Sequence, residues 1–349
     1  MVFTLTNTIG KYAKNPPGGG ANMVATGYST TTRIAYSING NDWFPSAVSV
    51  FSNAPTNIAY GNGTWIAAGS GGNTIAYSTN GITWKGSATN GGLSFVGGIA
   101  YGKNSSNNDV WVACGNNGVA QKMATSTDGG NTWTQCATNG GISGVTTAVA
   151  YGKDNLGAGL WIVGSGYNPG DIALARSTDG GNSWTACATK GGITSTVNCV
   201  AYGKDDLGAG LWVAVADTTG GGNTIVYSSD GNTWTPVVNA NRGGLTDSVR
   251  GVAYGKDDLG AGLWVAVGNK IGYSIATSTN GTTWTGRSVA GLTSSGASVA
   301  YGQDALGNWL WVATGSGGNC IAKSTNGTTW TGITSNGGLT SGNHIAIKI

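Results

Sequence analysis

The chain of 349 residues has no glutamate and a single histidine, His344, and only 9% of its residues are charged. Its net charge of +3 is small and spread along the chain, so we expect no nucleic-acid partner and no attraction to an acidic membrane. No apolar run approaches a membrane span in length, so no membrane insertion is expected. The mixed polar start, residues 1–17, does not resemble a secretory signal.

The shortage of titratable side chains also argues against catalysis. Most glycosidases need two carboxylates with separated pKa values, but most of the aspartates in this chain lie in repeated turns. A Ser/His/Asp arrangement would have to use His344. The related loops 153–159, 204–210 and 256–262 each offer at most two carboxylates and lack the alternating ligands of a calcium loop. We therefore expect no enzymatic activity, no metal and no cofactor. The five cysteines form no Cys-x-x-Cys pair and are expected to fill small core positions.

One short pattern is present seven times: a serine, then Asp or Asn, then Gly, then a closing Trp. Each copy follows a short apolar run, which predicts a strand, a tight turn and a second strand. The Asp or Asn oxygen can accept the N–H groups of its own turn, and the Trp can cover the hairpin. The structural residues of the seven copies are Asn39 and Trp43, Asn80 and Trp84, Asp128 and Trp133, Asp179 and Trp184, Asp230 and Trp234, Asn280 and Trp284, and Asn326 and Trp330.

The closing tryptophans are 41 to 51 residues apart, a period that holds about four short strands. This predicts an all-β fold, a seven-bladed β-propeller of four-stranded antiparallel blades. The first repeat lacks its Ala-Tyr-Gly strand, and the tail 344–348 has a similar run. The C-terminal strand is therefore expected to complete the first blade and close the ring. Residues 1–20 would form an N-terminal arm, which could attach a partner, and residues 21–349 a single propeller domain.

The repeated turn resembles the Asp-box of bacterial sialidase-type (BNR) propellers, best in the stretch Ser126 to Trp133. Four of the seven copies have Asn in place of Asp, which favours a scaffold role. The resemblance implies a β-propeller but not sialidase activity, because that family uses a cluster of three arginines. This chain has five arginines in all and lacks the Arg-Ile-Pro motif, since Arg33 and Ile34 are followed by Ala35.

Loops on the face opposite the repeated turns vary most, and variable loops on a repeat scaffold usually bind ligands. The candidate ligand-binding residues are Tyr167, Asn168 and Asp171 in one loop and Arg242, Asp247 and Arg250 in another. The alternative for the charged residues of the second loop is that they are solvated and pair with one another.

Two functions fit these features. The first is a multivalent, lectin-like module that binds glycans through aromatic and polar side chains at sites repeated between blades. The alternative is a structural or interaction protein, such as an assembly factor or a component of a virion or cell surface, whose partner is another protein. The periodic Trp and Tyr residues are also what blade packing requires.

Overall fold

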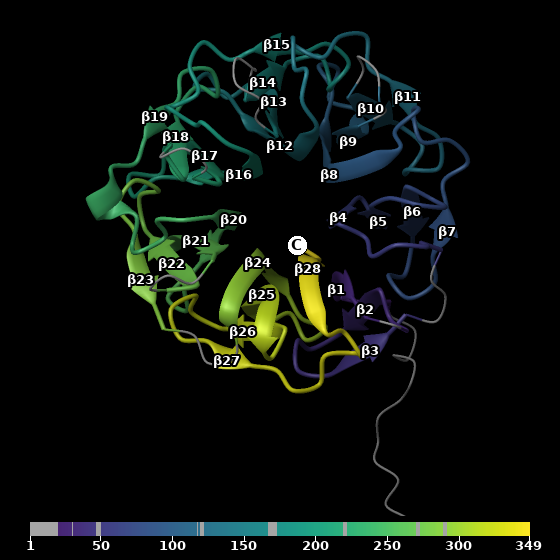
Figure 1. Cartoon of the computed structure of the whole chain (residues 1–349), viewed down its shortest axis with the longest axis vertical. Helices are drawn as coiled ribbons and strands as arrows, with labels where there is room; N and C mark the ends of the chain where they lie inside the picture. Colours follow the sequence, from purple (N-terminus) through teal and green to yellow (C-terminus); the bar gives the residue numbers. More distant parts are fainter. Residues whose placement is uncertain are drawn as a thin grey trace, which may run out of the picture.

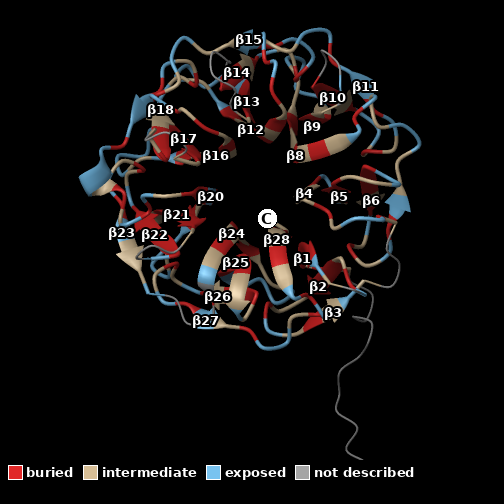
Figure 2. Ribbon diagram, viewed as in Figure 1, coloured by how far each residue is buried: buried red, intermediate tan, exposed pale blue. Residues whose placement is uncertain are grey.

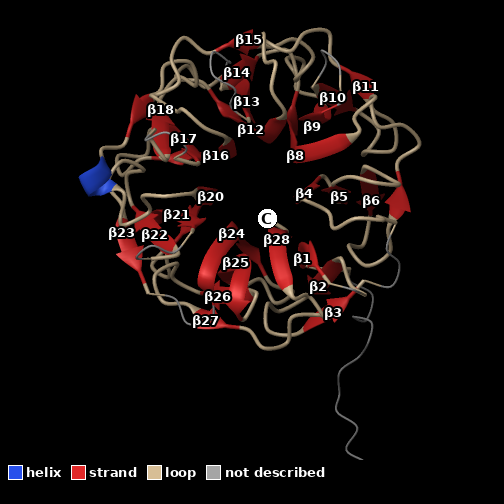
Figure 3. Ribbon diagram, viewed as in Figure 1, coloured by secondary structure: helices blue, strands red, loops and turns tan. Residues whose placement is uncertain are grey.

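The computed structural model describes residues 20–29, 31–46, 50–116, 118, 122–166, 173–218, 222–269, 273–288 and 292–349. The expected N-terminal arm, apart from Gly20, lies outside these residues. The described chain forms seven four-stranded antiparallel sheets arranged as blades in a ring (Figure 1). The only helix in this part of the chain is one 3-10 turn, η1 (Asn239–Asn241) (Figure 3). The predicted seven-bladed β-propeller is confirmed.

Each blade has four positions, counted outward from the axis. The innermost strands are β28 (Ser341–Ile347), β4 (Asn57–Gly61), β8 (Phe95–Lys103), β12 (Thr146–Lys153), β16 (Val197–Lys204), β20 (Val249–Lys256) and β24 (Leu292–Gln303). The second strands are β1 (Met23–Tyr28), β5 (Thr64–Ala68), β9 (Asp109–Asn116), β13 (Gly159–Ser165), β17 (Gly210–Ala216), β21 (Gly262–Gly268) and β25 (Trp309–Gly318).

The two outer positions hold shorter strands. The third strands are β2 (Ile34–Ser37), β6 (Ile75–Ser78), β10 (Met123–Ser126), β14 (Leu174–Ser177), β18 (Ile225–Ser228), β22 (Ile275–Ser278) and β26 (Ile321–Ser324). The outermost strands are β3 (Trp43–Pro45), β7 (Lys85–Gly86), β11 (Thr134–Gln135), β15 (Thr185–Ala186), β19 (Thr235–Pro236), β23 (Thr285–Arg287) and β27 (Thr331–Gly332). We number the blades from β28-β1-β2-β3 as blade 1 to β24-β25-β26-β27 as blade 7.

The ring closes as the sequence predicts. Strand β28 pairs antiparallel with β1, with Ala346 opposite Val24 and Ile345 opposite Ala25. The first blade therefore combines the last strand of the chain with three strands from its beginning, and the C-terminus lies near the axis (Figure 1). Without β28, the inner side of β1 would have no strand partner.

The core lies between neighbouring blades rather than in one central cluster (Figure 2). One cluster joins Leu160 and Ile162 of blade 4 to Val200 and Trp212 of blade 5, and six further clusters repeat this arrangement around the ring. The indole N–H of Trp212 donates to the Lys153 carbonyl of blade 4 at 2.8 Å. Trp161, Trp264 and Trp311 donate across the blade boundary in the same way, whereas the indole N–H of Trp65 has no partner.

The seven Trp-closed turns adopt the predicted local geometry. In the third-blade copy, the N–H of Thr132 donates to Asp128 Oδ1 at 2.9 Å and the indole of Trp133 donates to the Gly130 carbonyl at 2.9 Å. All seven closing tryptophans are buried, but the indole N–H groups of Trp84 and Trp234 have no hydrogen-bond partner. The Asp or Asn oxygens therefore serve the turns in which they lie.

Candidate functional site

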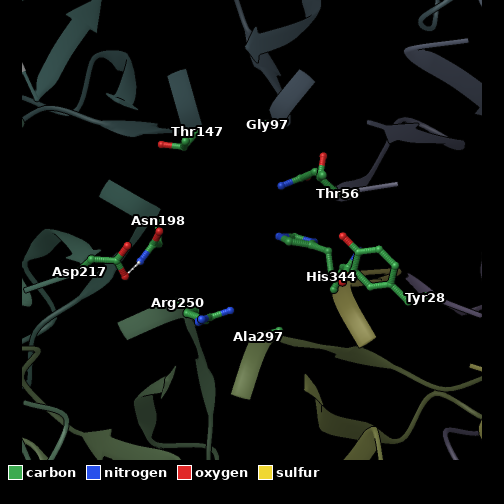
Figure 4. A pocket seen from close by; sticks show the side chains of 11 residues that line it. Tyr28, Thr56, Gly97, Thr147, Asn198, Asp217, Arg250, Ala297 and His344 are labelled. Atoms are coloured by element: carbon green, nitrogen blue, oxygen red, sulfur yellow. Dashed lines mark hydrogen bonds between the residues drawn. The ribbon is translucent and has the colours of Figure 1, made fainter. Parts of the chain in front are cut away.

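An axial cavity opens on the face that carries the variable loops. The inner strands enter the ring from this face, and each blade places around the axis one residue that lies in its inner strand or just before it. These seven residues, which we call the axial mouth, are Thr56, Gly97, Thr147, Asn198, Arg250, Ala297 and Asn343 (Figure 4). Together with Tyr28, Asn57, Asp217 and His344 they line a cavity of about 440 Å³.

Hydrogen bonds between blades hold the polar side chains of the mouth in place. The hydroxyl of Thr56 donates to the Val96 carbonyl of the next blade at 2.7 Å. The amide of Asn198 donates to the Val249 carbonyl at 2.9 Å in the same way. Since each bond crosses a blade boundary, the mouth is fixed by the closure of the ring rather than by one loop.

Arg250 differs from the other mouth residues because its guanidinium is exposed and has no hydrogen bond or ion pair with any residue that the structure describes. The nearby carboxylate of Asp217 is already engaged. It accepts a hydrogen bond from the Asn198 amide at 2.7 Å (Figure 4) and another from the hydroxyl of Ser248. The mouth therefore presents one cation that is free to meet an anionic group, beside a carboxylate that the protein itself uses.

A second cavity of about 300 Å³ shares Asp217 and Arg250 with the first and extends outward between blades 5 and 6. Its lining includes Asp247, which accepts a hydrogen bond from the Thr218 hydroxyl at 3.4 Å and from the Asn269 amide at 3.5 Å. Arg250 and Asp247, which the sequence predicted to lie in one site, thus line the same groove.

Arg242 is placed differently, although it lies in the same loop as Asp247. Its side chain is only 3% exposed, and its Nε donates to the Val237 carbonyl at 2.9 Å while Nη2 donates to Asn223. Burial lowers the pKa of Arg242. This arginine fastens the loop to its own blade and does not line the mouth cavity or the adjoining groove.

The other predicted site residues, Tyr167, Asn168 and Asp171, lie outside the described residues, so their candidacy stays a prediction. Within the described ranges the one ion pair joins Lys103 and Asp109. The alternative in which the charged residues of loop 239–250 pair with one another is therefore not seen there.

Sequence reasoning missed Asn198, Asp217 and Tyr28, and it assigned His344 only a structural place in the closing strand. The signal was available in the repeat: the mouth residue stands two positions before the Ile or Val that precedes each Ala-Tyr-Gly, as Asn198 does before Val200. His344 lies one position nearer to that Ile, and its Nδ1 is buried without a hydrogen-bond partner. Burial lowers the pKa of His344 to about 4.

The opposite face is built from turns that use their own polar groups. A cavity of about 420 Å³ there is lined by Asp205, Asp206, Tyr227 and Asp230, between blades 5 and 6. Oδ1 of Asp205 accepts the N–H of Leu207 at 3.0 Å, and Asp230 accepts that of Thr233 at 2.8 Å. No group of three or more His, Cys or Asp side chains suited to a metal occurs among the described residues.

Comparison with known proteins supports the fold and goes no further. No protein-family model matches the chain, and no curated protein matches its sequence. Solved structures do match. YCF48 bound to a D1 peptide is 16% identical with a TM-score of 0.52, and the alignment covers 85% of this chain and 87% of that one. At such identity the similarity establishes the propeller architecture alone.

Two glycoside hydrolase family 74 (GH74) structures are similar to the same extent. The Niastella koreensis GH74 enzyme is 17% identical with a TM-score of 0.54, over 89% of this chain. The GH74 xyloglucanase of Xanthomonas campestris is 14% identical with a TM-score of 0.52, over 95% of this chain. Each alignment covers 54% of the GH74 chain, so this protein spans about half the length of those enzymes. Among the described residues, no helix has the length and hydropathy needed to cross a bilayer.

Proposed function

We propose that this propeller is a non-enzymatic binding protein and that its axial mouth holds a glycan bearing an anionic group. The observation that carries the proposal is the unpaired guanidinium of Arg250 at the edge of a cavity otherwise lined mainly by neutral groups. A guanidinium offers a planar pair of N–H donors that matches a carboxylate, so it favours an acidic sugar over a neutral one.

The remaining lining suits the rest of a sugar ring. Asn57, Thr147, Asn198 and Asn343 offer amide and hydroxyl groups, and Tyr28, which is 59% exposed, offers an aromatic surface at the edge. Such a mixture of polar groups and one aromatic ring can meet both the hydroxyls and the C–H faces of a carbohydrate. A cavity of about 440 Å³ is within the usual range for small-ligand sites.

This proposal differs from the sequence-based expectation in valency. Equivalent sites between blades would give up to seven weak contacts per molecule. The axial mouth, in contrast, would act as a single site, because every blade contributes one residue to it. Among these seven residues the only arginine is Arg250, from blade 6. We therefore propose one glycan per ring, with affinity set by that site rather than by avidity.

The absence of catalysis is part of the proposal. Glycoside hydrolysis generally requires one carboxylate to act as an acid and a second to act as base or nucleophile. In the mouth cavity the lining carboxylate is Asp217, whose Oδ1 accepts hydrogen bonds from both Asn198 and Ser248. A carboxylate occupied in this way is suited to positioning its neighbours.

The test is a glycan array followed by calorimetry with the best ligand, comparing the wild type with Arg250→Gln. Arg176→Gln is the matched control, because it removes the same charge from β14, away from the mouth. We expect acidic sugars among the ligands, one site per chain, and affinity about tenfold or more weaker for Arg250→Gln alone. Equal affinity in all three proteins, or several equivalent sites per chain, would contradict the axial site.

The second candidate is a protein-binding role, as in assembly. One observation favours it: the similar structure of YCF48 was solved bound to a D1 peptide. In this chain Arg250 could pair with a peptide carboxylate in the same mouth. Peptides ending in a free carboxylate should then bind more tightly than their amidated forms, and Arg250→Gln should remove the difference. A blank glycan array together with this result would favour the protein-binding role.

A further inference from the structure

Four leucines project into solvent on the face opposite the axial mouth. Leu156, Leu207, Leu259 and Leu306 are 88%, 90%, 90% and 85% exposed. Each occupies the same position in the turn between the first and second strands of blades 4, 5, 6 and 7. We call these four residues the leucine arc. Leucine is seldom exposed to this degree, and its recurrence in four consecutive blades gives an ordered apolar feature.

The fold does not need leucine at this position. The corresponding turn of blade 3 has Ser106, whose N–H donates to Asn104 Oδ1 at 3.0 Å. The N–H of Leu156 donates to Asp154 Oδ1 at 2.9 Å in the same manner. The two turns are built alike although one carries a hydroxyl and the other an isobutyl group. The leucine side chain therefore adds nothing to the turn that serine cannot supply.

Most of the backbone N–H groups at the tip of each turn have partners within the turn. Asp154 Oδ1 also accepts the N–H of Ala158 at 2.8 Å, and the N–H of Gly157 donates to the Asp154 carbonyl at 3.1 Å. Asp205, Asp257 and Asp304 repeat this arrangement. Because these N–H donors have partners within the turn, few donors would lose a hydrogen bond to water when the tip enters a lipid surface.

The arrangement of the four tips favours a flat target. Blades of a propeller are related by rotation about its axis, so equivalent turns lie at similar heights along that axis. Four separate side chains at one height can enter a fluid lipid layer together. A protein partner would need four pockets at matching separations.

The charges beside the leucines are mixed. Lys153, Lys204 and Lys256 are exposed in these turns, and so are Asp206 and Asp258. Zwitterionic headgroups offer a phosphate for the ammonium groups and a quaternary ammonium for the carboxylates. With Asp154, Asp205, Asp257 and Asp304 included, carboxylates outnumber ammonium groups, so an anionic surface would repel this face.

We infer that the leucine arc docks the protein on a zwitterionic lipid surface, with the leucine side chains entering the boundary between headgroups and acyl chains. No backbone segment spans the bilayer in this arrangement. Docking through this face would turn the axial mouth away from the lipid and leave it open to ligands. The inference is independent of the glycan proposal, because the two use opposite faces and share no residues.

Co-sedimentation of the purified protein with phosphatidylcholine vesicles tests the inference. We expect the wild type to sediment with them, each Leu→Ser change to lower the partition coefficient about tenfold, and the quadruple variant to remain in solution. Serine is the substitution of choice because Ser106 occupies this position in blade 3. Val238→Ser is the matched control, since Val238 is 60% exposed but lies near the outer edge of blade 5.

A second vesicle composition and the state of the free protein complete the test. Replacing about a third of the lipid with phosphatidylserine should weaken binding, since the turns carry excess carboxylate. Wild-type protein that stays in solution with phosphatidylcholine would overturn the inference, as would a quadruple variant that sediments like the wild type. Self-association that depends on the leucines, without vesicle binding, would assign the arc to contacts between copies of the chain. Unchanged melting temperatures would establish that the variants are folded.

Discussion

Gly152 faces the aromatic ring of Tyr202 in the next blade, and a Cβ atom added to Gly152 would lie 2.3 Å from Cγ of that ring. The same added Cβ atom would lie 2.8 Å from Cζ2 of Trp212. The ring centroids of Trp212 and Tyr202 are 5.0 Å apart. The recurring Ala-Tyr-Gly run is thereby explained, because the glycine of one inner strand makes room for the Tyr–Trp pair of the next blade.

Gly152→Ala should therefore destabilise the protein by about 1–3 kcal/mol through overpacking. The measurement is chemical unfolding of the wild type and the variant. The double variant Gly152→Ala, Tyr202→Ala provides the control, because removing the tyrosine ring opens the space that the new methyl group needs. The cost of Gly152→Ala should be smaller in that background. Equal costs in both backgrounds would show that the ring contact does not set the requirement for glycine.

A closing tryptophan should contribute far more stability than an exposed one. Trp133 is 4% exposed and its indole donates to Gly130, whereas Trp309 is 44% exposed and stacks on Tyr301. Trp133→Ala should destabilise by about 3–5 kcal/mol, as expected for loss of a buried aromatic ring. Trp309→Ala should cost about 0.5–1.5 kcal/mol. If denaturant unfolding gave similar losses for both, the packing role of the repeated turn would be wrong.

The architecture was predictable because the same physical requirement is repeated seven times. The closing tryptophans gave the number of blades, and the tail that includes His344 and Ile345 gave the closing strand. Strand ends were less predictable. The outer strand β19 is only Thr235–Pro236, although the sequence around it has no turn signal before residue 239, since the N–H of Trp234 donates to the Thr189 hydroxyl of blade 4 and Pro236 has no N–H.

The candidate site was only partly predictable, because it depends on where each loop folds. The sequence predicts Arg242 and Arg250 in one variable loop, yet Arg250 lies at the start of β20 and is exposed at the mouth, whereas Arg242 lies in the preceding loop and is bonded to Val237. No local pattern distinguishes the two arginines. Asn198 and Asp217 were missed because they become neighbours only when blade 5 is folded, 19 residues apart in sequence.

The acidic turn residues predict a loss of stability in acid. Burial raises the pKa of Asp128, but hydrogen bonds from the hydroxyl and N–H of Thr132 and from Ser126 outweigh it, so the pKa lies below its ordinary value of 3.8. Asp179 and Asp230 behave in the same way. The folded state favours the ionised form, so this stabilisation is complete above about pH 3.8 and is lost as the pH falls further.

In the triple variant Asp128→Asn, Asp179→Asn, Asp230→Asn, the melting temperature should therefore fall less below about pH 3.8 than it does in the wild type. Asparagine is accommodated naturally, since Asn280 Oδ1 accepts the N–H groups of Thr282 and Thr283 in blade 6. Melting curves from neutral pH down to strong acid provide the measurement. Parallel curves for the two proteins would mean that these carboxylates do not cause acid unfolding.

His344 should act at a higher pH than the aspartates, and it is the only histidine in the chain. Burial in the closing strand lowers its pKa from 6.5 to about 4, although the polar backbone groups of Ile58 and Ile345 favour the protonated ring and oppose the shift. Below pH 6.5 the imidazole of His344 is protonated in the unfolded chain, whereas in the folded chain it stays neutral until the pH is near 4. Stability should therefore fall as the pH is lowered through this range.

The variant His344→Gln removes this dependence while keeping a polar side chain beside the axial mouth. Its melting temperature should change less than that of the wild type between pH 6.5 and about 4.5, above the range in which the turn aspartates titrate. NMR titration of the single imidazole gives the folded-state pKa directly. A measured pKa near 6.5 would contradict the burial of this ring in the closing strand, and with it the proposed fixed geometry of β28 at the mouth.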